Sequence, residues 1–425
     1  VVDNPLLPRD LAAVADRAAG HPLFLLELLA GFSGDLEPDA LPQSIEALLA
    51  ARIDRLERHD RRLLRFASVL GDTFDLATAQ DALEGLIDGA GDPAAWHGLD
   101  DFLDTPDTGV FHFRHDWYRD AAYEGLSYKA RREVHGRAGT VLERRSDADE
   151  QLGVLSMHFF RARDYAKAWH YAVAGADDAA AQFANAEAAR LYQRALQAAP
   201  HLPSVPKTEV GSIAERLGDV SELVGDYEAA VTAYRRARRF TAGDPARTIH
   251  LMTKQGLLNE RTGRYSNALR WFSRALRLAP RHPPADVQQA IIESRVAYAG
   301  VRFRQARYRD TVRWCRAALE APAILEMRKE QAHALYLLDH SLSFLGEKTD
   351  DAYALRALDL YERLGDPVRQ ANVLNNLGVE AYHAGRWDDA LEYQRRNKET
   401  RERAGDVIGA AIAEYNRGLI LVDQG

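Results

Sequence analysis

Three consecutive residues, Arg114, His115 and Asp116, are the first candidates for chemistry, because the histidine among them is placed to meet a phosphate group. They stand where a short apolar stretch gives way to a predicted helix, in the segment FHFRHDWYRDAAYEGL. The free amides and the positive dipole end of a helix amino terminus attract anions. On spacing alone helix capping is the favoured interpretation, because an aspartate at a helix start commonly caps it. His112 precedes His115 by three residues, but the spacing indicates no third ligand, so we expect no metal site.

Two amide side chains, Asn376 and Asn416, are candidates for binding a partner. They lie 40 residues apart, at equivalent positions of successive predicted helices. Amides that face a groove can bond the backbone of an extended peptide, and amides at this position can equally bond between neighbouring helices. The sequence leaves both interpretations open.

The sequence shows no catalytic motif. A phosphate loop of the form Gly-x-x-x-x-Gly-Lys-Ser/Thr is absent, and no acidic run after an apolar strand offers a Mg²⁺ ligand. The single cysteine, Cys315, falls where the repeat pattern places an inward-facing aromatic residue, which predicts a buried, inert thiol. We therefore expect no catalytic residues and no enzyme activity, neither hydrolysis nor cyclisation of ATP.

A small residue and an aromatic residue recur together in the second half of the chain. Ala230 and Tyr234 share a four-residue spacing with Ala268 and Phe272. A small residue lets two helices cross closely, and the aromatic ring fills the space beside the crossing. The period is about 40 residues, above the ~34 of the shortest tetratricopeptide units. We predict tetratricopeptide-like helical pairs over residues 151–425, about six and a half in number with the last truncated.

Glycines on the first helices of these pairs, at Gly218, Gly256 and Gly378, are predicted to mark the closest helix packing. Stacked pairs expose a long curved face, which is a docking surface more often than a catalytic one. We expect a protein or peptide partner on the concave face of the repeats.

The first third of the chain carries no such repeat. Short helices are predicted from Ser44, from about residue 60 and from about residue 76, with a fourth near residues 93–102. Turn residues between 105 and 109 then join two apolar segments in a hairpin. Short helices followed by a hairpin outline a winged-helix domain, assigned to residues 43–118, and residues 119–150 are predicted as connecting helices. The expected fold class is all-α, with one small β-hairpin.

Charge and hydropathy exclude several functions. The net charge is -8, and the candidate recognition helix, DLATAQDALEGLI, is acidic, so we do not expect DNA binding. The basic residues Lys129, Arg131, Arg132 and Arg137 are interpreted as a solvated helix face. No apolar run reaches the ~20 residues that cross a bilayer. We expect a cytoplasmic protein without membrane contact, and a chain that is part of a larger one.

Three segments carry a resemblance to a known family: GHPLFLLELL, LPQSIEALLAARIDRLERHDRRLLRFASVLGDTFD and FRHDWYRDAAYEGLSYKARREVHGRAG. They resemble the carboxy-terminal half of a signal-transducing ATPase with numerous domains, the STAND class. They are most similar to the ATPase regions behind bacterial class III adenylate or guanylate cyclase domains, and more distantly to those of large transcriptional activators. The resemblance covers about residues 1–145, so residues 1–42 correspond to the end of the ATPase helical lid.

This resemblance implies roles for two groups of residues. Gly20, His21 and Pro22 match a motif whose proline packs against the adenine. Arg114, His115 and Asp116 match a Met-His-Asp motif whose histidine contacts the β-phosphate of ADP, with Arg in place of Met. The other half of that pocket belongs to an upstream nucleotide-binding domain. ADP or ATP is thus expected in the intact parent, and no cofactor is expected to bind this chain tightly.

The sequence as a whole predicts the regulatory and sensor region of a bacterial signal-transducing ATPase, most similar to those that control a nucleotide cyclase. Two alternatives stay open: the equivalent region of a STAND transcriptional activator, and a non-catalytic docking scaffold.

Overall fold

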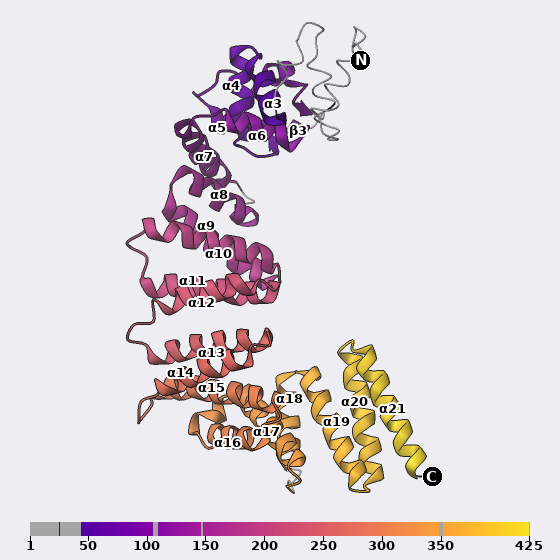
Figure 1. The fold of residues 1–425 in the computed structure, drawn as a ribbon. Helices are drawn as coiled ribbons and strands as arrows, with labels where there is room; N and C mark the ends of the chain where they lie inside the picture. The colour runs from indigo at the N-terminus through magenta and orange to yellow at the C-terminus, as the bar shows by residue number, and fades with distance from the viewer. Residues whose placement is uncertain (1–24, 26–43, 105–108, 146–147, 348–351, 425) are drawn as a thin grey trace. The chain divides into compact units, whose positions relative to one another are not determined.

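The computed structural model describes residue 25 and residues 44–104, 109–145, 148–347 and 352–424 of the 425-residue chain. The chain divides into two compact units, Val1–Val205 and Pro206–Gly425. The described part is mainly helical with one small sheet, which confirms the predicted fold class (Figure 1). Among the described helices, none is both long and apolar enough to cross a membrane.

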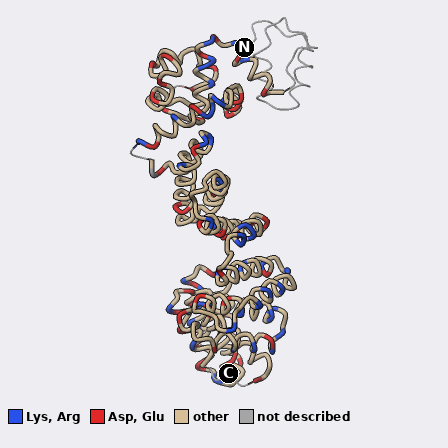
Figure 2. Tube along the Cα trace, turned by 90° about the vertical axis from the view of Figure 1, so that its left-hand side faces the viewer, with Lys and Arg blue, Asp and Glu red and all other residues tan. Residues whose placement is uncertain are grey.

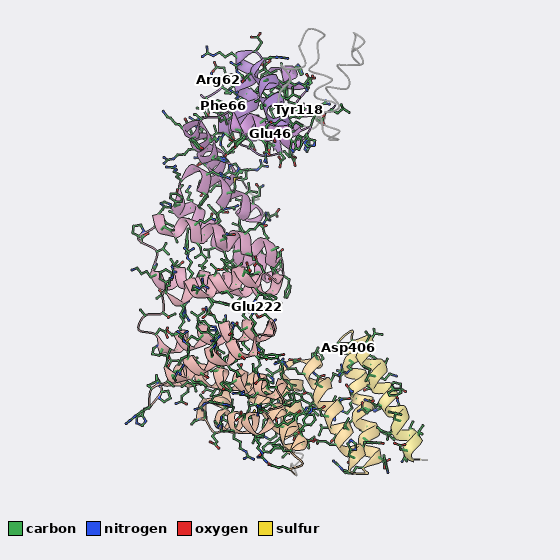
Figure 3. The ribbon with its side chains drawn as sticks, viewed as in Figure 1. Glu46, Arg62, Phe66, Tyr118, Glu222 and Asp406 are labelled. Atoms are coloured by element: carbon green, nitrogen blue, oxygen red, sulfur yellow. The ribbon has the colours of Figure 1, made fainter. Side chains whose placement is uncertain are left out.

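From residue 44 onward, the first unit contains a winged-helix domain. Ser44 starts its first helix by accepting a hydrogen bond from the Ala47 amide, as predicted. Arg62 lies over the Phe66 ring on the next helix, 6.0 Å from its centroid (Figure 3). The elements of the domain are α3 (Ile45–Asp54), α4 (Arg58–Ala67), β1 (Thr73–Asp75), α5 (Leu76–Leu83), the 3-10 helix η2 (Pro93–Leu99), β2 (Leu103–Asp104), β3 (Val110–Phe113) and α6 (Asp116–Glu124).

The sheet has three strands rather than the two of the predicted hairpin. Strands β2 and β3 form that hairpin, with Leu103 opposite Phe113. Strand β1 pairs antiparallel with the other edge of β3, with Phe74 opposite Phe111. The sequence did not predict β1, because three residues directly before a helix are too short to show strand alternation. The third strand leaves β3 central and fixes the position where α6 begins.

Aromatic side chains form the core behind this sheet. Phe74 stacks on Phe111 with ring centroids 5.4 Å apart, and Trp96 lies 4.6 Å from Phe111. Trp96 is 1% exposed, and its indole N–H donates to the Ala90 carbonyl oxygen at 3.1 Å. Burial of each such ring contributes about 1.5–3 kcal/mol, so the core holds β3 firmly.

Residues 116–145 form two helices. The first, α6, ends at Gly125, and Ser127 then caps α7 (Tyr128–Glu143) by accepting from the Ala130 amide at 3.2 Å. A serine cap competes with helix continuation, since its hydroxyl satisfies an amide at a new helix start. The break separates the winged-helix domain from α7.

Helical pairs follow in the remainder of the first unit. Helix α7 packs on α8 with Gly139 against Phe159, the combination of glycine and aromatic ring that also marks the later pairs. Helix α9 packs on α10, where Ala188 is fully buried. The elements are the 3-10 helix η3 (Ala148–Gln151), α8 (Leu152–Ala162), α9 (Tyr165–Ala181), α10 (Asn185–Ala198) and the 3-10 helix η4 (Ala199–His201).

The second unit consists of consecutive helical pairs. A Cβ atom on Gly218 would overlap the Tyr234 ring, and one on Gly256 would overlap the Phe272 ring, so these glycines mark close packing as predicted. The helices are α11 (Lys207–Val224), α12 (Tyr227–Arg238), α13 (Pro245–Arg261), α14 (Tyr265–Arg277), α15 (Ala285–Arg304), α16 (Tyr308–Leu319), the 3-10 helix η5 (Pro322–Glu326), α17 (Arg328–Phe344), α18 (Ala352–Leu364), α19 (Pro367–His383), α20 (Trp387–Arg403) and α21 (Val407–Gln424).

Loops between these pairs repeat one arrangement of glycine and aspartate. Gly365 and Gly405 have φ of +63° and +73°, a conformation that glycine adopts without strain. Asp406 then accepts from the Gly409 amide at 2.9 Å and so caps α21 (Figure 3). Cys315 is fully buried as predicted, and burial raises the pKa of its thiol to about 12. An inert thiol follows.

Candidate functional site

The predicted phosphate-contacting residues lie at the amino terminus of α6. The His115 ring is exposed, and its Nδ1 accepts a hydrogen bond from the Trp117 amide at 3.3 Å, so it caps the helix. Arg114 pairs with Asp104 at 3.0 Å, which ties it to the neighbouring strand β2. In this arrangement the His115 ring is exposed on the surface beside a helix terminus. Both a structural role and a role in anion binding fit this geometry.

The second half of the predicted nucleotide motif lies elsewhere in the chain. Gly20, His21 and Pro22 fall outside the described residues, so their placement beside His115 stays a prediction. Among the described residues, no cluster of histidine, cysteine and carboxylate side chains could hold a metal ion.

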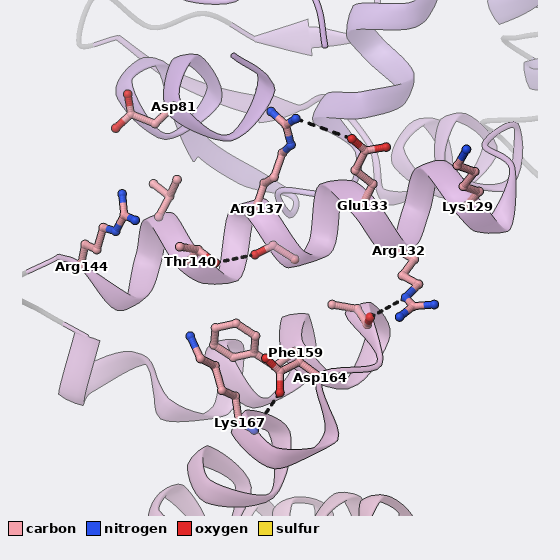
Figure 4. Close-up of a pocket in the computed structure, with 13 residues that line it drawn as sticks. Asp81, Lys129, Arg132, Glu133, Arg137, Thr140, Arg144, Phe159, Asp164 and Lys167 are labelled. Carbon is pink, nitrogen blue, oxygen red and sulfur yellow. Dashed lines mark hydrogen bonds and ion pairs between the residues drawn. The ribbon is translucent and has the colours of Figure 1, made fainter. Parts of the chain in front are cut away.

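Basic side chains of α7 line an open groove of about 690 Å³ in the first unit (Figure 4). Most of them are engaged in contacts within the unit. Arg132 donates to the Ala162 carbonyl oxygen at 2.9 Å, and Arg137 donates to that of Glu84 at 2.5 Å. Lys167 on α9 also lines the groove, and its ammonium group pairs with the Glu143 carboxylate of α7 at 2.6 Å. These contacts correct the interpretation of the basic run as a solvated helix face, because Arg132 and Arg137 join α7 to neighbouring elements.

The second unit contains a groove of about 680 Å³ that we name the first-helix groove. It is formed by side chains of α13, α15, α17 and α19, the first helices of four successive pairs. Charged groups dominate its lining. Because each wall belongs to a different repeat, the groove exists only when the repeats are stacked.

His250 lies at one end of this groove, between carboxylates of the two neighbouring repeats. Its Nε2 is 3.2 Å from Glu215 and its Nδ1 is 2.6 Å from Glu293. Hydrogen bonds to Glu215 and then Glu293 raise the pKa of His250 to about 9. Burial alone would raise the pKa of Glu215, but bonding to His250 and the charge of Lys254 outweigh it and lower that pKa to about 2. His250 is therefore a cation at neutral pH.

Lys254 extends the same network by one helical turn. Its ammonium group lies 2.9 Å from Glu215 and 2.8 Å from Asp219, both on α11. Asp219 also accepts from the Tyr234 hydroxyl at 2.8 Å. Burial opposes the charge on Lys254, yet the two carboxylates raise its pKa. Paired charges at this depth fix the stacking of α11 on α13.

The opposite end of the groove is more basic. Arg304 pairs with Glu260 across neighbouring repeats. Lys329 is exposed, and no hydrogen bond or ion pair of its ammonium group occurs among the residues that the structure describes. Burial, followed by the charges of Arg369, Arg304 and Lys329, lowers the pKa of His333 to about 4. A neutral histidine thus lies among three cations.

The two asparagines singled out by sequence both bond between repeats. Asn376 Nδ2 lies 2.7 Å from His340 Nδ1 on α17, and Asn416 Nδ2 donates to Asn375 on α19 at 3.4 Å. Both side chains are half-buried. These contacts correspond to the inter-repeat alternative, and a role in binding a partner stays a prediction.

Sequence reasoning missed the charged residues of the first-helix groove. The sequence did contain a signal for them, because these residues contact side chains that lie about one repeat away in the sequence. Lys254 and Glu215 are separated by 39 residues, His250 and Glu293 by 43. Opposite charges at that spacing on successive first helices indicate contacts across repeats.

Comparison with known proteins gives similarity of fold only. No family model matches this chain, and neither does any curated protein. Among solved structures, it is similar to the STAND protein with a tetratricopeptide repeat sensor PH0952 from Pyrococcus horikoshii, at 12% identity and a TM-score of 0.45. That alignment covers 99% of this chain and 61% of the STAND protein. The chain therefore spans about three fifths of that protein's length.

Two other solved structures are similar to about two thirds of this chain. One is the Rap conjugation gene regulator of plasmid pLS20 in complex with the Phr* peptide, at 14% identity and a TM-score of 0.42, covering 69% of this chain and 92% of that one. The other is aspartyl phosphate phosphatase F from Bacillus subtilis, at 14% identity and a TM-score of 0.43, covering 69% and 75%. At these values the similarities assign neither a family nor a function.

Proposed function

We propose that this chain is the sensor and docking region of a multidomain signal-transducing ATPase, and that its repeats bind a protein or peptide partner. The first-helix groove carries this proposal, because it presents charged groups of four successive repeats on a fixed helical frame. Such groups give a partner specificity and a fixed register. The resemblance of residues 1–145 to STAND ATPases supports the class of the parent protein.

We further propose that His115 contributes to a nucleotide pocket in the parent, with Gly20, His21, Pro22, Arg114 and Asp116. Its exposed ring at the start of α6 and the resemblance support this role. ADP or ATP would bind between an upstream domain and the winged helix. This chain alone has no phosphate-loop motif, so it should not bind nucleotide tightly.

Control of an adenylate or guanylate cyclase, and a cytoplasmic location in a bacterium, belong to the same proposal and rest on the resemblance. A partner on the repeats can regulate the parent only if it binds two states of the protein with different affinities. Bound ADP would hold the parent in a closed state. The proposal is that partner binding favours the open state instead.

A docking scaffold without nucleotide control is the second candidate. The observation that favours it is that Arg114 and His115 already make local contacts, one to Asp104 and one to the Trp117 amide. A direct role in DNA binding gains no support, because α5 carries an acidic residue, Asp81, and no basic residue.

The docking proposal is tested by partner capture with charge-reversed variants. We expect a partner retained by the 425-residue chain to be lost on Lys329→Glu with Arg369→Glu, which changes the groove. The control is Arg277→Glu with Arg281→Glu, which makes the same charge change at exposed positions outside the groove. Equal retention by all three proteins would exclude the groove as the docking site.

A further inference from the structure

A small side pocket adjoins the basic end of the first-helix groove. Its volume is about 200 Å³. It shares residues with the groove and extends between α15, α17, α18 and α19. The lining residues are Arg304, His333, Tyr336, Tyr361, Arg369 and Asn372.

The Tyr361 hydroxyl on this pocket wall lacks a partner. Tyr361 is 1% exposed, and its hydroxyl has no hydrogen-bond partner among the described residues. A buried hydroxyl left without a partner costs free energy, so native structures rarely keep one. By contrast, the buried Tyr234 hydroxyl donates to Asp219 at 2.8 Å. The Tyr361 hydroxyl is therefore a donor that a group from outside the chain can satisfy.

Positive charge is concentrated at the same place. The Arg369 guanidinium lies over the Tyr361 ring, 6.0 Å from its centroid, and is 3.6 Å from Asp366, which is beyond hydrogen-bonding distance. Arg304 reaches the pocket from α15, although Glu260 pairs with it. Lys329 adds an exposed ammonium group at the mouth of the groove.

The charged groups nearest to His333 are cations. Its neighbours include the phenols of Tyr336 and Tyr361 as well as the three cations, and Glu330 lines the adjoining groove. Burial and the charges of Arg369, Arg304 and Lys329 all oppose its protonation. The pocket is thus a positive environment that also contains a free hydroxyl donor.

We propose that the side pocket binds a carboxylate group of the ligand that occupies the first-helix groove, with the Tyr361 hydroxyl and the Arg369 guanidinium as donors. This inference rests on the proposed docking function. An ionised carboxylate only accepts hydrogen bonds, which matches a pocket that offers donors and positive charge. The carboxylate comes from an acidic side chain or from the C-terminus of a peptide.

Binding of three short acetylated peptides to the full chain, measured by calorimetry, tests the inference. The first contains one internal glutamate and an amidated end, the second is tetraglycine with a free C-terminus, and the third is amidated tetraglycine. Inorganic phosphate is the competing anion. We expect at least one carboxylate peptide to bind and the neutral peptide to bind at least tenfold more weakly. The preferred carboxylate peptide identifies the source of the group.

Variants locate this binding. Tyr361→Phe and Arg369→Gln should each weaken carboxylate binding by about tenfold, the effect of losing one hydrogen bond to a charged group. Tyr353→Phe and Arg363→Gln lie on α18 outside the pocket and should leave it unchanged. A bound carboxylate should also raise the pKa of His333, which histidine NMR detects independently of affinity.

Several results would overturn the inference. These are equal binding of neutral and charged peptides, no binding of either carboxylate peptide, phosphate binding more tightly than both, or insensitivity to Tyr361→Phe and Arg369→Gln. If all three peptides bound equally, and their binding were lost in the variant with Lys329→Glu and Arg369→Glu, the carboxylate pocket would be rejected. The docking proposal would be kept. The two proposals therefore fail separately.

Discussion

At the scale of single residues, His250 is held in its protonated form by two carboxylates. The pKa of an ordinary histidine is 6.5, and hydrogen bonds to Glu215 and Glu293 raise that of His250 to about 9. The folded protein therefore retains a proton that the unfolded chain releases above pH 6.5. The stabilisation is complete below pH 6.5 and is lost as the pH rises through about 9.

We expect His250→Gln to remove this pH dependence. For the unchanged chain, the free energy of unfolding of the second unit should fall by roughly 1–2 kcal/mol between pH 6.5 and 9, allowing for solvent screening of a partly exposed pair. Urea unfolding at several pH values measures it. If the free energy of unfolding changed equally with pH in His250→Gln and in the unchanged chain, another group would be responsible.

A pair of buried histidines behaves in the opposite way. His135 Nδ1 lies 3.0 Å from His158 Nδ1, between α7 and α8, and His135 Nε2 lies 3.0 Å from the Tyr123 hydroxyl. Burial is the main cause that lowers their pKa values, to about 3 for His135 and about 4 for His158. Both rings are neutral in the folded state, whereas the unfolded chain takes up protons below pH 6.5.

This pair predicts a loss of stability on acidification. The contribution of the two rings is present above pH 6.5 and is lost as the pH falls through about 4 for His158 and about 3 for His135. Histidine NMR at pH 5 should show these two rings still neutral, in addition to the His333 ring, and His135→Gln and His158→Gln should each remove one of these signals. Protonation of both rings near pH 6.5 would contradict the buried contact.

At the scale of elements, close contacts between a glycine and an aromatic ring set the geometry of the helical pairs. Gly256 on α13 packs against the Phe272 ring on α14, which leaves no space for a methyl group. Adding one must displace the ring or separate the helices. Gly418 on α21 is the matched case, because nothing lies within 4 Å of the position of its Cβ atom.

We predict opposite effects of the same substitution at these two positions. Gly256→Ala should destabilise the chain by about 1–3 kcal/mol through overpacking. Gly418→Ala should stabilise it by up to about 1 kcal/mol, since alanine has the better helix propensity. Thermal unfolding measures both. If Gly256→Ala proved as stable as Gly418→Ala, the close packing of α13 on α14 would be wrong.

The helical pairs could be predicted from sequence because their determinants are local. Ala230 and Tyr234 lie one helical turn apart, and Gly218 lies on the preceding helix of the same pair. Strand β1 could not be predicted from sequence, because its three residues acquire strand geometry only by pairing with β3. The break between α6 and α7 lies at Gly125 and Ser127, which form a recognisable helix stop and start.

The candidate site was less predictable than the fold. His115 was singled out from its place at a helix start and from the resemblance to STAND ATPases, and its role stays a prediction. The environment of His250 depends on Glu215 and Glu293, which belong to two other repeats. Likewise, the unpartnered Tyr361 hydroxyl is a property of packing that no residue pattern reveals.

At the scale of the whole molecule, charge is distributed rather than segregated. Figure 2 shows basic and acidic residues interspersed along the described trace, and the net charge is -8. This distribution does not favour nonspecific binding to nucleic acid or to an anionic membrane. Recognition must therefore depend on local arrangements such as the first-helix groove.

The whole chain is expected to be inactive toward ATP. Without a phosphate-loop motif in the sequence, no group is expected to position the γ-phosphate for transfer. Purified chain incubated with radiolabelled ATP should release no more phosphate or cyclic nucleotide than buffer. Turnover that survives repurification would require a catalytic site that this account lacks.

Site-specific photo-crosslinking tests the central claim, that the first-helix groove holds the partner. A photoreactive residue is placed at Ala297, which lines the groove on α15, or at Leu278, which is 46% exposed and lies outside it. We predict that the partner captured by the chain crosslinks from position 297 and not from position 278. Crosslinking from position 278 alone would place the partner outside the groove and contradict the account.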